Sequence, residues 1–201
     1  MPNGTPTFWL LAGPNGVGKT TYAMRHLRAV SGSVHFVNLD EIARGLSPLD
    51  PSAAQTDAAR VALSRARGFM QARATFAMET TLSGRTHLEL LKEAAACGLS
   101  TAMLYFSVRS PDICLERIAR RVAEGGHDVP EPVVRRRFAR SLANLPLYLA
   151  LCDLWRVYEA SGPRPALAIE GRRRALRFDA PEVLATGHPA LGRLHGSDAE
   201  P

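Results

Sequence analysis

The stretch that decides the fold is Gly13-Pro14-Asn15-Gly16-Val17-Gly18-Lys19-Thr20. It fits the pattern G-x-x-x-x-G-K-[ST] at every fixed position, and it lies between a β-prone apolar run, residues 7–12, and a stretch of helical character, residues 19–30. The glycines of this pattern let successive backbone N–H groups turn toward phosphate oxygens, and the start of the helix adds the positive end of its dipole. The sequence therefore predicts a nucleotide-binding phosphate loop, formed by Gly13, Asn15, Gly16, Val17, Gly18, Lys19, Thr20 and Thr21.

Two side chains of this loop have chemistry of their own. Lys19 is long enough to reach the β- and γ-phosphates of a nucleotide, and the hydroxyl of Thr20 can ligate Mg²⁺. We therefore expect ATP and Mg²⁺ as cofactors. The loop alone indicates binding of a nucleoside triphosphate, and it does not separate kinases from GTPases, motors or switches. A glycine turn that matches the pattern by chance is the alternative interpretation.

The pattern continues outward from the loop as strands that alternate with helices. Further strand candidates occupy residues 34–39, 75–78, 101–108, 154–158 and 166–169, and helix candidates occupy residues 52–72, 86–97, 111–123 and a stretch from about residue 132. This alternation predicts a three-layer α/β fold of the phosphate-loop NTPase and kinase type, with a parallel sheet of about five strands between helices. The C-terminal ends of the strands then share one edge, where ligands bind. We expect a single domain over residues 1–180 and a loosely ordered tail over residues 181–201.

Composition excludes several other classes of protein. The 201 residues are 46% hydrophobic and 22% charged, which is typical of a soluble globular domain and not of a disordered or fibrous chain. No apolar run approaches the roughly 20 residues of a membrane span, and no basic segment precedes the first apolar run as in a signal peptide. The three cysteines lack C-x-x-C spacing and indicate neither a disulfide framework nor a zinc site, so we expect a cytoplasmic protein.

The positive net charge says little about binding partners. The net charge is +6, and the excess is almost all arginine, because Lys19 and Lys92 are the only lysines. Because codon bias alone can produce such a skew, the positive net charge is not evidence of nucleic-acid binding. We therefore do not expect nucleic acid as a partner. The charge remains compatible with a small anionic substrate.

Two carboxylates fall at the ends of strand candidates. Asp40 follows the second strand and Glu79 follows the third, so a parallel sheet would bring both into the crevice beside the phosphate loop. Asp40 is the candidate general base, and Glu79 is the candidate ligand of the metal or of a water, in the Walker-B position. Three alternatives stay open: Asp40 as a helix cap, Glu41 in the role of Asp40, and Glu79 in a buried salt bridge.

The loop after Glu79 carries candidate substrate contacts. The hydroxyl groups of Thr80, Thr81 and Ser83 are suited to hydrogen-bonding the phosphate or sugar of an acceptor, and so is the guanidinium of Arg85. Capping of the helix that begins near residue 86 is the alternative role.

An arginine-rich pair of helices, about residues 112–142, is expected to form a closing lid. Phosphoryl transfer builds negative charge that a rigid guanidinium can clamp, and a lid excludes water. The candidate catalytic arginines are Arg117 and Arg121, four residues apart on one helix face, and Arg136 on the next helix. His127, in the connecting loop, is a candidate substrate contact. Solvated arginines paired with surface acids are the alternative interpretation.

Four segments together resemble the zeta toxin family of phosphate-loop kinases. They are G-P-N-G-x-G-K-T-T, N-x-D-E-I, E-T-T-L-S-G and R-x-x-x-R-V-x-x-G-G-H-D-V-P-E, and the likeness extends from about residue 7 to residue 144. The resemblance implies a fold similar to that of nucleotide kinases. It also implies phosphorylation of a hydroxyl of UDP-N-acetylglucosamine, the reaction by which family members block cell-wall synthesis.

The resemblance also implies roles for individual residues. Lys19 and Thr20 would hold ATP–Mg²⁺, Asp40 would be the general base, Thr81 and Glu79 would meet the sugar nucleotide, and Arg121 would be a lid arginine. The sequence also departs from the family. Family members carry a substrate-contacting glutamate in the helix before the third strand, whereas residues 58–73 contain arginines and no glutamate. They also carry a second lid arginine shortly before the lid proline, where this chain has His127 and Asp128, and Arg136 of the next helix is the candidate substitute.

The expected function is therefore that of an ATP-dependent small-molecule kinase of zeta-toxin type. Its partners would be ATP and a small hydroxyl-bearing acceptor, namely UDP-N-acetylglucosamine or another nucleotide-linked or anionic metabolite. An antitoxin cannot be deduced from one chain. The alternatives are a metabolic or antibiotic-resistance kinase with an unrelated acceptor, a polynucleotide-end kinase, and a non-catalytic protein that binds ATP or nucleic acid.

Overall fold

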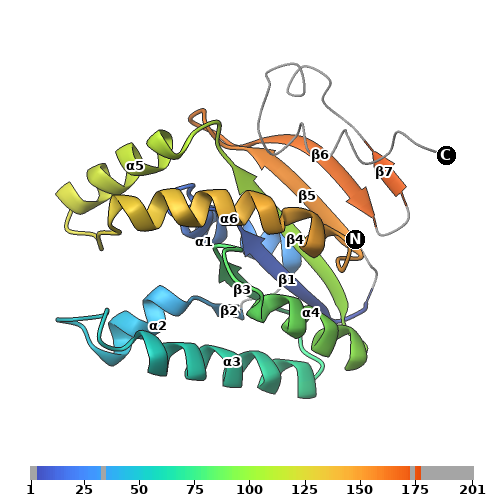
Figure 1. Cartoon of the computed structure of the whole chain (residues 1–201). Coiled ribbons are helices and arrows are strands. Elements are labelled where there is room, and N and C mark those ends of the chain that lie inside the picture. The colour runs from blue at the N-terminus through green and yellow to red at the C-terminus, as the bar shows by residue number, and fades with distance from the viewer. Residues whose placement is uncertain (1–3, 33–34, 173–174, 178–201) are drawn as a thin grey trace.

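The computed structural model describes residues 4–32, 35–172 and 175–177. Its centre is a sheet of seven described strands in the order β2-β3-β1-β4-β5-β6-β7 (Figure 1). The strands are β1 (Thr7–Ala12), β2 (Phe36–Val37), β3 (Phe76–Thr80), β4 (Ser100–Ser107), β5 (Leu154–Glu159), β6 (Ala166–Arg172) and β7 (Ala175–Arg177). The first five strands in this order pair in parallel, whereas β6 is antiparallel to β5 and β7 is antiparallel to β6.

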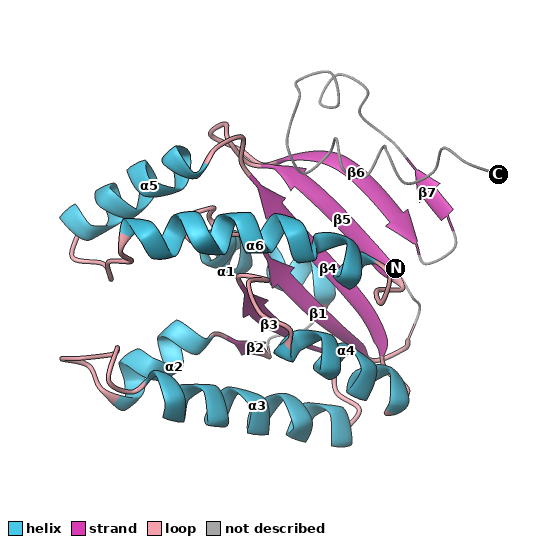
Figure 2. Ribbon diagram, in the orientation of Figure 1, coloured by secondary structure: helices cyan, strands magenta, loops and turns pink. Residues whose placement is uncertain are grey.

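Helices cover both faces of the sheet (Figure 2). They are α1 (Lys19–Ser31), α2 (Leu39–Leu46), α3 (Gln55–Gln71), α4 (Thr86–Ala96), α5 (Pro111–Ala123) and α6 (Glu131–Leu149). Helix α1 lies behind the sheet in Figure 1 and α4 and α6 lie in front of it, which gives three layers. Helix α3 packs against β2 and β3 at one edge. Within the described ranges, no helix combines the length and the apolar character needed to cross a membrane.

Strand β1 lies inside the parallel part of the sheet because it is apolar on both faces. All six of its residues are buried, as expected for a parallel strand covered by helices on both sides. Phe8 of β1 stacks on Phe76 of β3 with ring centroids 4.5 Å apart, which joins the two strands across the core. Ala12 is in register with Thr80, so both strands end at the same edge of the sheet. The residues that follow these strand ends therefore meet in one place.

The predicted three-layer α/β architecture is confirmed, with two corrections. The sheet exceeds the expected five strands and is not wholly parallel, because a hairpin connection rather than a helical crossover follows β5. The second strand, expected over residues 34–39, ends at Val37, since Asn38 caps α2 and the helix begins at Leu39. The predicted tail, residues 181–201, lies outside the described residues.

Candidate active site

The loop between β1 and α1 adopts the conformation that its glycines permit. Gly13 has a φ of +139°, and a Cβ at this position would lie 2.2 Å from the carbonyl oxygen of Phe106. Gly16 has a φ of +76°, and its Cβ would lie 2.6 Å from the carbonyl oxygen of Cys114. Glycine is therefore required at both positions by backbone conformation and by space. Gly18 begins α1 without a side-chain cap, which leaves the first N–H groups of the helix available to an anion.

Lys19 is held over this loop in a largely dry environment. The residue is only 5% exposed, and its Nζ donates a 2.8 Å hydrogen bond to the carbonyl oxygen of Pro14. The same Nζ lies 3.7 Å from Oε1 of Glu79. Burial lowers the pKa of Lys19, and the charge of Glu79 opposes that shift. A positive charge with little water around it attracts phosphate more strongly than an exposed one.

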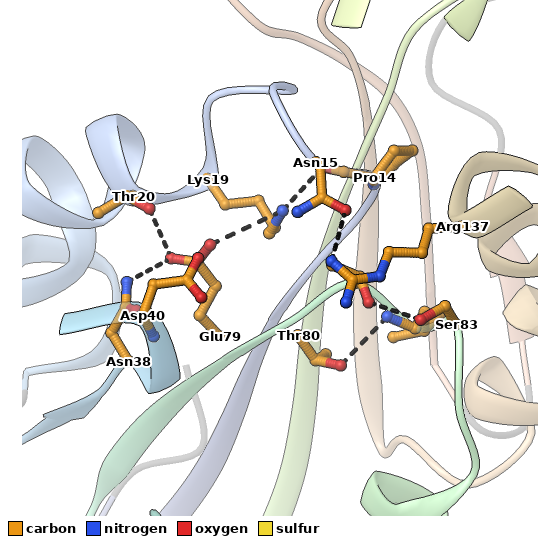
Figure 3. A network of polar contacts seen from close by, with 12 residues as sticks. Pro14, Asn15, Lys19, Thr20, Asn38, Asp40, Glu79, Thr80, Ser83 and Arg137 are labelled. Carbon is orange, nitrogen blue, oxygen red and sulfur yellow. Dashed lines mark hydrogen bonds and ion pairs between the residues drawn. The ribbon is translucent and has the colours of Figure 1, made fainter. Parts of the chain in front are cut away.

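Glu79 joins the phosphate loop to the ends of the neighbouring strands (Figure 3). Its Oε2 accepts hydrogen bonds from Oγ1 of Thr20 at 2.8 Å and from Nδ2 of Asn38 at 3.0 Å. Thr20 and Glu79, the two residues predicted as metal ligands, are therefore in direct contact. Leu11, which precedes the loop by two residues, is the β1 partner of Glu79, so sheet register fixes this placement.

The donor set suits Mg²⁺. This ion is commonly held by one or two protein oxygens together with substrate phosphates and water, and Thr20 and Glu79 supply a hydroxyl and a carboxylate. Across residues 4–32, 35–172 and 175–177, no group of three or more His, Cys, Asp or Glu side chains could hold a metal ion by itself. The residues therefore fit a metal that is bound jointly with a nucleotide.

Asn38 positions the second predicted carboxylate. Its Oδ1 accepts hydrogen bonds from the backbone N–H groups of Asp40 at 2.9 Å and Glu41 at 3.2 Å, which caps α2, while its Nδ2 holds Glu79. Asp40 is therefore the second residue of a helix and not a strand-end residue, and the cap is Asn38. The Asp40 side chain lines the same cleft as Lys19. Its negative charge, like that of Glu79, opposes the lowering of the pKa of Lys19 by burial.

A cleft of about 570 Å³ lies over these groups, a volume typical of small-molecule sites. It is bounded by the phosphate loop, α2, α3, the end of β3, the first turn of α4, residues 127–130 and α6. The predicted site residues that line it are Asn15, Lys19, Asp40, Glu79, Thr80, Thr81 and His127. Of the remaining loop residues, Thr21 is exposed on α1 and Val17 is buried beneath the loop.

Thr80 connects the end of β3 to α4 through a histidine that the sequence did not single out. The Thr80 hydroxyl accepts a hydrogen bond from the N–H of Leu82 at 3.1 Å and lies 3.3 Å from Nδ1 of His87. The ring of His87 lines the cleft, and its Nε2 is buried without a hydrogen-bond partner among the described residues. Burial lowers the pKa of His87 from 6.5 to about 4, so the imidazole is neutral at pH 7.

We expect this neutral histidine to make the fold less stable in mild acid. Between pH 6.5 and pH 4 the unfolded chain binds a proton at His87 that the folded chain does not bind, so the free energy of unfolding falls as the pH falls. Relative to His87→Phe, which cannot titrate, the wild-type protein should lose about 2 kcal/mol between pH 7 and about pH 4.5 in urea denaturation. A constant difference between the two proteins over this range would contradict a buried neutral imidazole.

The two predicted arginines of α5 make structural contacts instead of lining the cleft. Arg117 donates hydrogen bonds to the carbonyl oxygens of Val17 in the phosphate loop, at 3.4 Å, and of Ala160 after β5, at 2.8 Å. Arg117 therefore links the phosphate loop to the segment that follows β5. Arg121 donates a 2.6 Å hydrogen bond to the carbonyl oxygen of His127, which ties α5 to the connection that leads into α6.

Helix α6 brings a different arginine to the cleft from the one predicted. Arg137 lines the cleft, and its Nη1 donates to Oδ1 of Asn15 at 3.3 Å (Figure 3). Arg136 is exposed and outside the cleft lining, and Arg135 pairs at the surface with Glu131. Sequence reasoning missed Arg137 because three consecutive arginines give no signal of which one faces inward.

The same helix holds the loop that follows β3. Asn144 donates to the carbonyl oxygen of Leu82 at 2.8 Å, and the Tyr148 hydroxyl donates to that of Gly84 at 2.8 Å. Arg85, a predicted substrate contact, is exposed at the start of α4 and does not line the cleft. Helix α6 therefore contacts both the phosphate loop and the loop after β3.

A glycine loop, a buried lysine and a carboxylate bonded to the loop threonine, on a three-layer sheet, define a phosphate-loop nucleotide-binding protein. The chain belongs to the AAA_33 family of AAA domains, whose family model matches residues 8–147. This range begins in β1, ends in α6 and includes every residue that lines the cleft.

Individual proteins are similar to this chain in sequence or in fold. The chain is 32% identical to an uncharacterised protein of Haemophilus influenzae over 126 residues, which are 63% of this chain and 88% of that protein. It is similar to a chain of the AvrRxo1-ORF1:AvrRxo1-ORF2 complex with ATP, with a TM-score of 0.69 and 17% identity over 90% of this chain. It is also similar to a chain of the PezAT chromosomal toxin–antitoxin system of Streptococcus pneumoniae, with a TM-score of 0.63 and 15% identity over 90% of this chain.

These structural likenesses concern the fold. This chain spans 63% of the AvrRxo1 chain and 73% of the PezAT chain. The shared architecture is the α/β fold of phosphate-loop NTPases and kinases, as predicted from the sequence.

Proposed function

We propose that this protein is an ATP-dependent kinase that transfers the γ-phosphoryl group to a hydroxyl of a small molecule. The observation that carries the proposal is the joint placement of Lys19, Glu79 and Asp40 at one cleft. A nucleotide switch needs only the lysine and the metal-side carboxylate. A further carboxylate that lines the same cleft is the group that an acceptor hydroxyl requires.

Each residue then has a distinct role. The loop N–H groups and Lys19 would hold the β- and γ-phosphates, and Thr20 and Glu79 would hold Mg²⁺, which would supply positive charge to neutralise the phosphate oxygens. Asp40 accepts or orients the proton of the acceptor hydroxyl. Lys19 and Arg137 stabilise the negative charge on the group in transfer. Most of the catalytic effect comes from positioning and from charge stabilisation.

The resemblance to the zeta toxin family extends the proposal to the acceptor and to partners. Its support is the shared sequence segments together with the fold shared with a chain of a toxin–antitoxin system. UDP-N-acetylglucosamine is the acceptor that this resemblance implies, with Thr81 and Glu79, which both line the cleft, as its contacts. A protein partner of the antitoxin type belongs to the same proposal, and residues 1–180 would form the single catalytic domain.

The test of the proposed function is ADP release that depends on an acceptor. Purified protein with ATP and Mg²⁺ should release ADP faster when an acceptor is added, measured in a coupled assay with UDP-N-acetylglucosamine and with a panel of sugars, nucleosides and hydroxylated antibiotics. ATP binding without faster ADP release from any addition would contradict the kinase and favour a non-catalytic switch.

Two neighbouring arginines provide a matched test of the lid. Arg137→Ala should lower the turnover number by about a hundredfold, because it removes a guanidinium that lies beside the phosphate loop. Arg136→Ala, one residue away and exposed, should keep turnover within about twofold of the wild-type value. Steady-state kinetics at saturating ATP measures both variants, and equal effects would remove Arg137 from the reaction.

A further inference from the structure

The cleft has two chemically different regions. Its charged residues lie toward the phosphate loop and α2, apart from Asp128 in the connection between α5 and α6, whereas α3, β3 and the segment around the start of α6 contribute apolar side chains. The apolar residues of these walls are Ala59, Ala62, Leu63, Met78, Val129, Pro130 and Val133, and Leu39 of α2 adds one at the charged end. A bound acceptor must present a hydroxyl to Asp40, and the remainder of the molecule then lies against these apolar walls.

Positive charge is confined to one end of the cleft. Apart from two histidines, the cationic side chains that line it within the described ranges are Lys19 and Arg137, and both lie at the phosphate loop. Three carboxylates line the same cleft, at Asp40, Glu79 and Asp128. An ATP triphosphate would occupy the two cations and Mg²⁺ would engage Glu79, so an anionic acceptor would face Asp40 and Asp128 without a counter-charge of its own.

The arginines of α3 do not change this balance. Arg60 pairs with Asp57 at the surface, and Arg67 pairs with Glu93. Arg65 lies over the ring of Phe69. None of these arginines lines the cleft, where α3 contributes Gln55 and small or apolar residues. The abundance of arginine in the sequence is therefore not an abundance of positive charge at the acceptor.

His87 adds a hydrogen-bonding group without charge. Leu82 donates to the Thr80 hydroxyl, which leaves the hydroxyl hydrogen free to bond to Nδ1 of His87. In the tautomer in which the Thr80 hydroxyl donates to Nδ1, the neutral ring carries its proton on Nε2, the atom that has no partner among the described residues. Leaving a buried N–H unpaired costs free energy, and an oxygen atom of a ligand in the cleft would recover it.

We propose that the acceptor is an uncharged hydroxyl compound with an apolar portion, which His87 recognises by donating a hydrogen bond from Nε2 to one of its oxygens. This inference rests on the proposed kinase function and narrows its substrate class. It departs from the acceptor that the resemblance to the zeta toxin family implies, because UDP-N-acetylglucosamine, like other nucleoside diphosphate sugars, carries a charged diphosphate. His87 is then a specificity-determining residue, distinct from the groups that handle the phosphates.

The substrate class is tested by fractionating acceptors by charge. A bacterial metabolite extract is passed over an anion-exchange resin, and the flow-through and the retained anions are each incubated with the protein, Mg²⁺ and γ-labelled ATP. The label should be transferred to a compound of the flow-through that also binds a reversed-phase resin. Transfer to a retained anion would overturn the inference of an uncharged acceptor and would support the proposed kinase activity. Transfer in neither fraction would overturn both the acceptor class and the kinase activity.

Variants of His87 are then assayed with the acceptor that the fractionation identifies. They test whether His87 binds that acceptor. His87→Phe should raise the KM for the acceptor by about tenfold to a hundredfold and leave the KM for ATP unchanged, because one hydrogen bond to the acceptor is lost. His87→Gln, whose amide also donates, should restore most of the affinity. Glu89→Gln, on the same helix and paired with Lys92 at the surface, is the matched control. An acceptor KM unchanged in His87→Phe would overturn the role of His87.

Discussion

Replacing Asp40 by asparagine will lower the turnover number by about a thousandfold and leave the affinity for ATP within about twofold of the wild-type value. Asparagine has nearly the same shape as aspartate, but its amide cannot take the proton of an acceptor hydroxyl. The cap of α2 survives, because Asn38 accepts its hydrogen bond from the backbone N–H of residue 40 and not from the side chain. Calorimetric titration with a non-hydrolysable ATP analogue and steady-state kinetics measure the two quantities separately.

Glu41→Gln is the matched control for this variant. Glu41 is the next residue of α2, but its carboxylate lies 3.3 Å from Arg44 at the surface and does not line the cleft. Its removal should leave turnover unchanged, which also decides between the two acids that the sequence left as alternatives. If Asp40→Asn abolished ATP binding, or if Glu41→Gln reduced turnover as strongly, Asp40 would not be the base.

Replacing Lys19 by methionine should have the second large effect, a fall of about a thousandfold in kcat/KM for ATP. Methionine fills a similar volume without the charge that faces the phosphates. Unlike the Asp40 variant, this one should bind ATP more weakly and also turn over more slowly, because the ammonium contacts phosphate both before and during transfer. The same calorimetric and kinetic measurements apply.

The chain offers a simple control, since Lys92 is its only other lysine. Lys92 is exposed on α4 and forms a 2.9 Å ion pair with Glu89. Lys92→Met should therefore match the wild-type protein in ATP affinity and in turnover, as surface ion pairs contribute little. Full ATP affinity in Lys19→Met would contradict the proposed phosphate site.

The phosphate end of the site could be predicted from the sequence because it depends on local geometry. The glycine spacing fixes the loop, and Lys19 and Thr20 are only a few bonds from it. Glu79 and Asp40 could be placed because parallel strands end at a common edge, although the helical start at Leu39 was not anticipated. One signal was available, since an asparagine that precedes an Asp-Glu pair is a typical start of a helix.

The lid could not be predicted residue by residue. Spacing along a helix shows which arginines share a face, but only the packing of the whole helix shows where that face points. Arg135 to Arg137 are consecutive, yet only Arg137 lines the cleft. Arg117 and Arg121 share a face as predicted, and both bind backbone carbonyl groups. No spacing pattern in the sequence pointed to His87, because its environment depends on contact with Thr80 and on burial by residues distant in the sequence.

The most direct measurement of the central claim is mass spectrometry of a bacterial metabolite extract incubated with Mg²⁺, this protein and ATP labelled with heavy oxygen in the γ-phosphoryl group. We predict that one compound gains a labelled phosphoryl group with the wild-type protein and that no compound gains it with Asp40→Asn. Label that appears only in inorganic phosphate, or equal labelling of a compound by both proteins, would contradict transfer from the Gly13–Thr20 loop to a hydroxyl activated by Asp40.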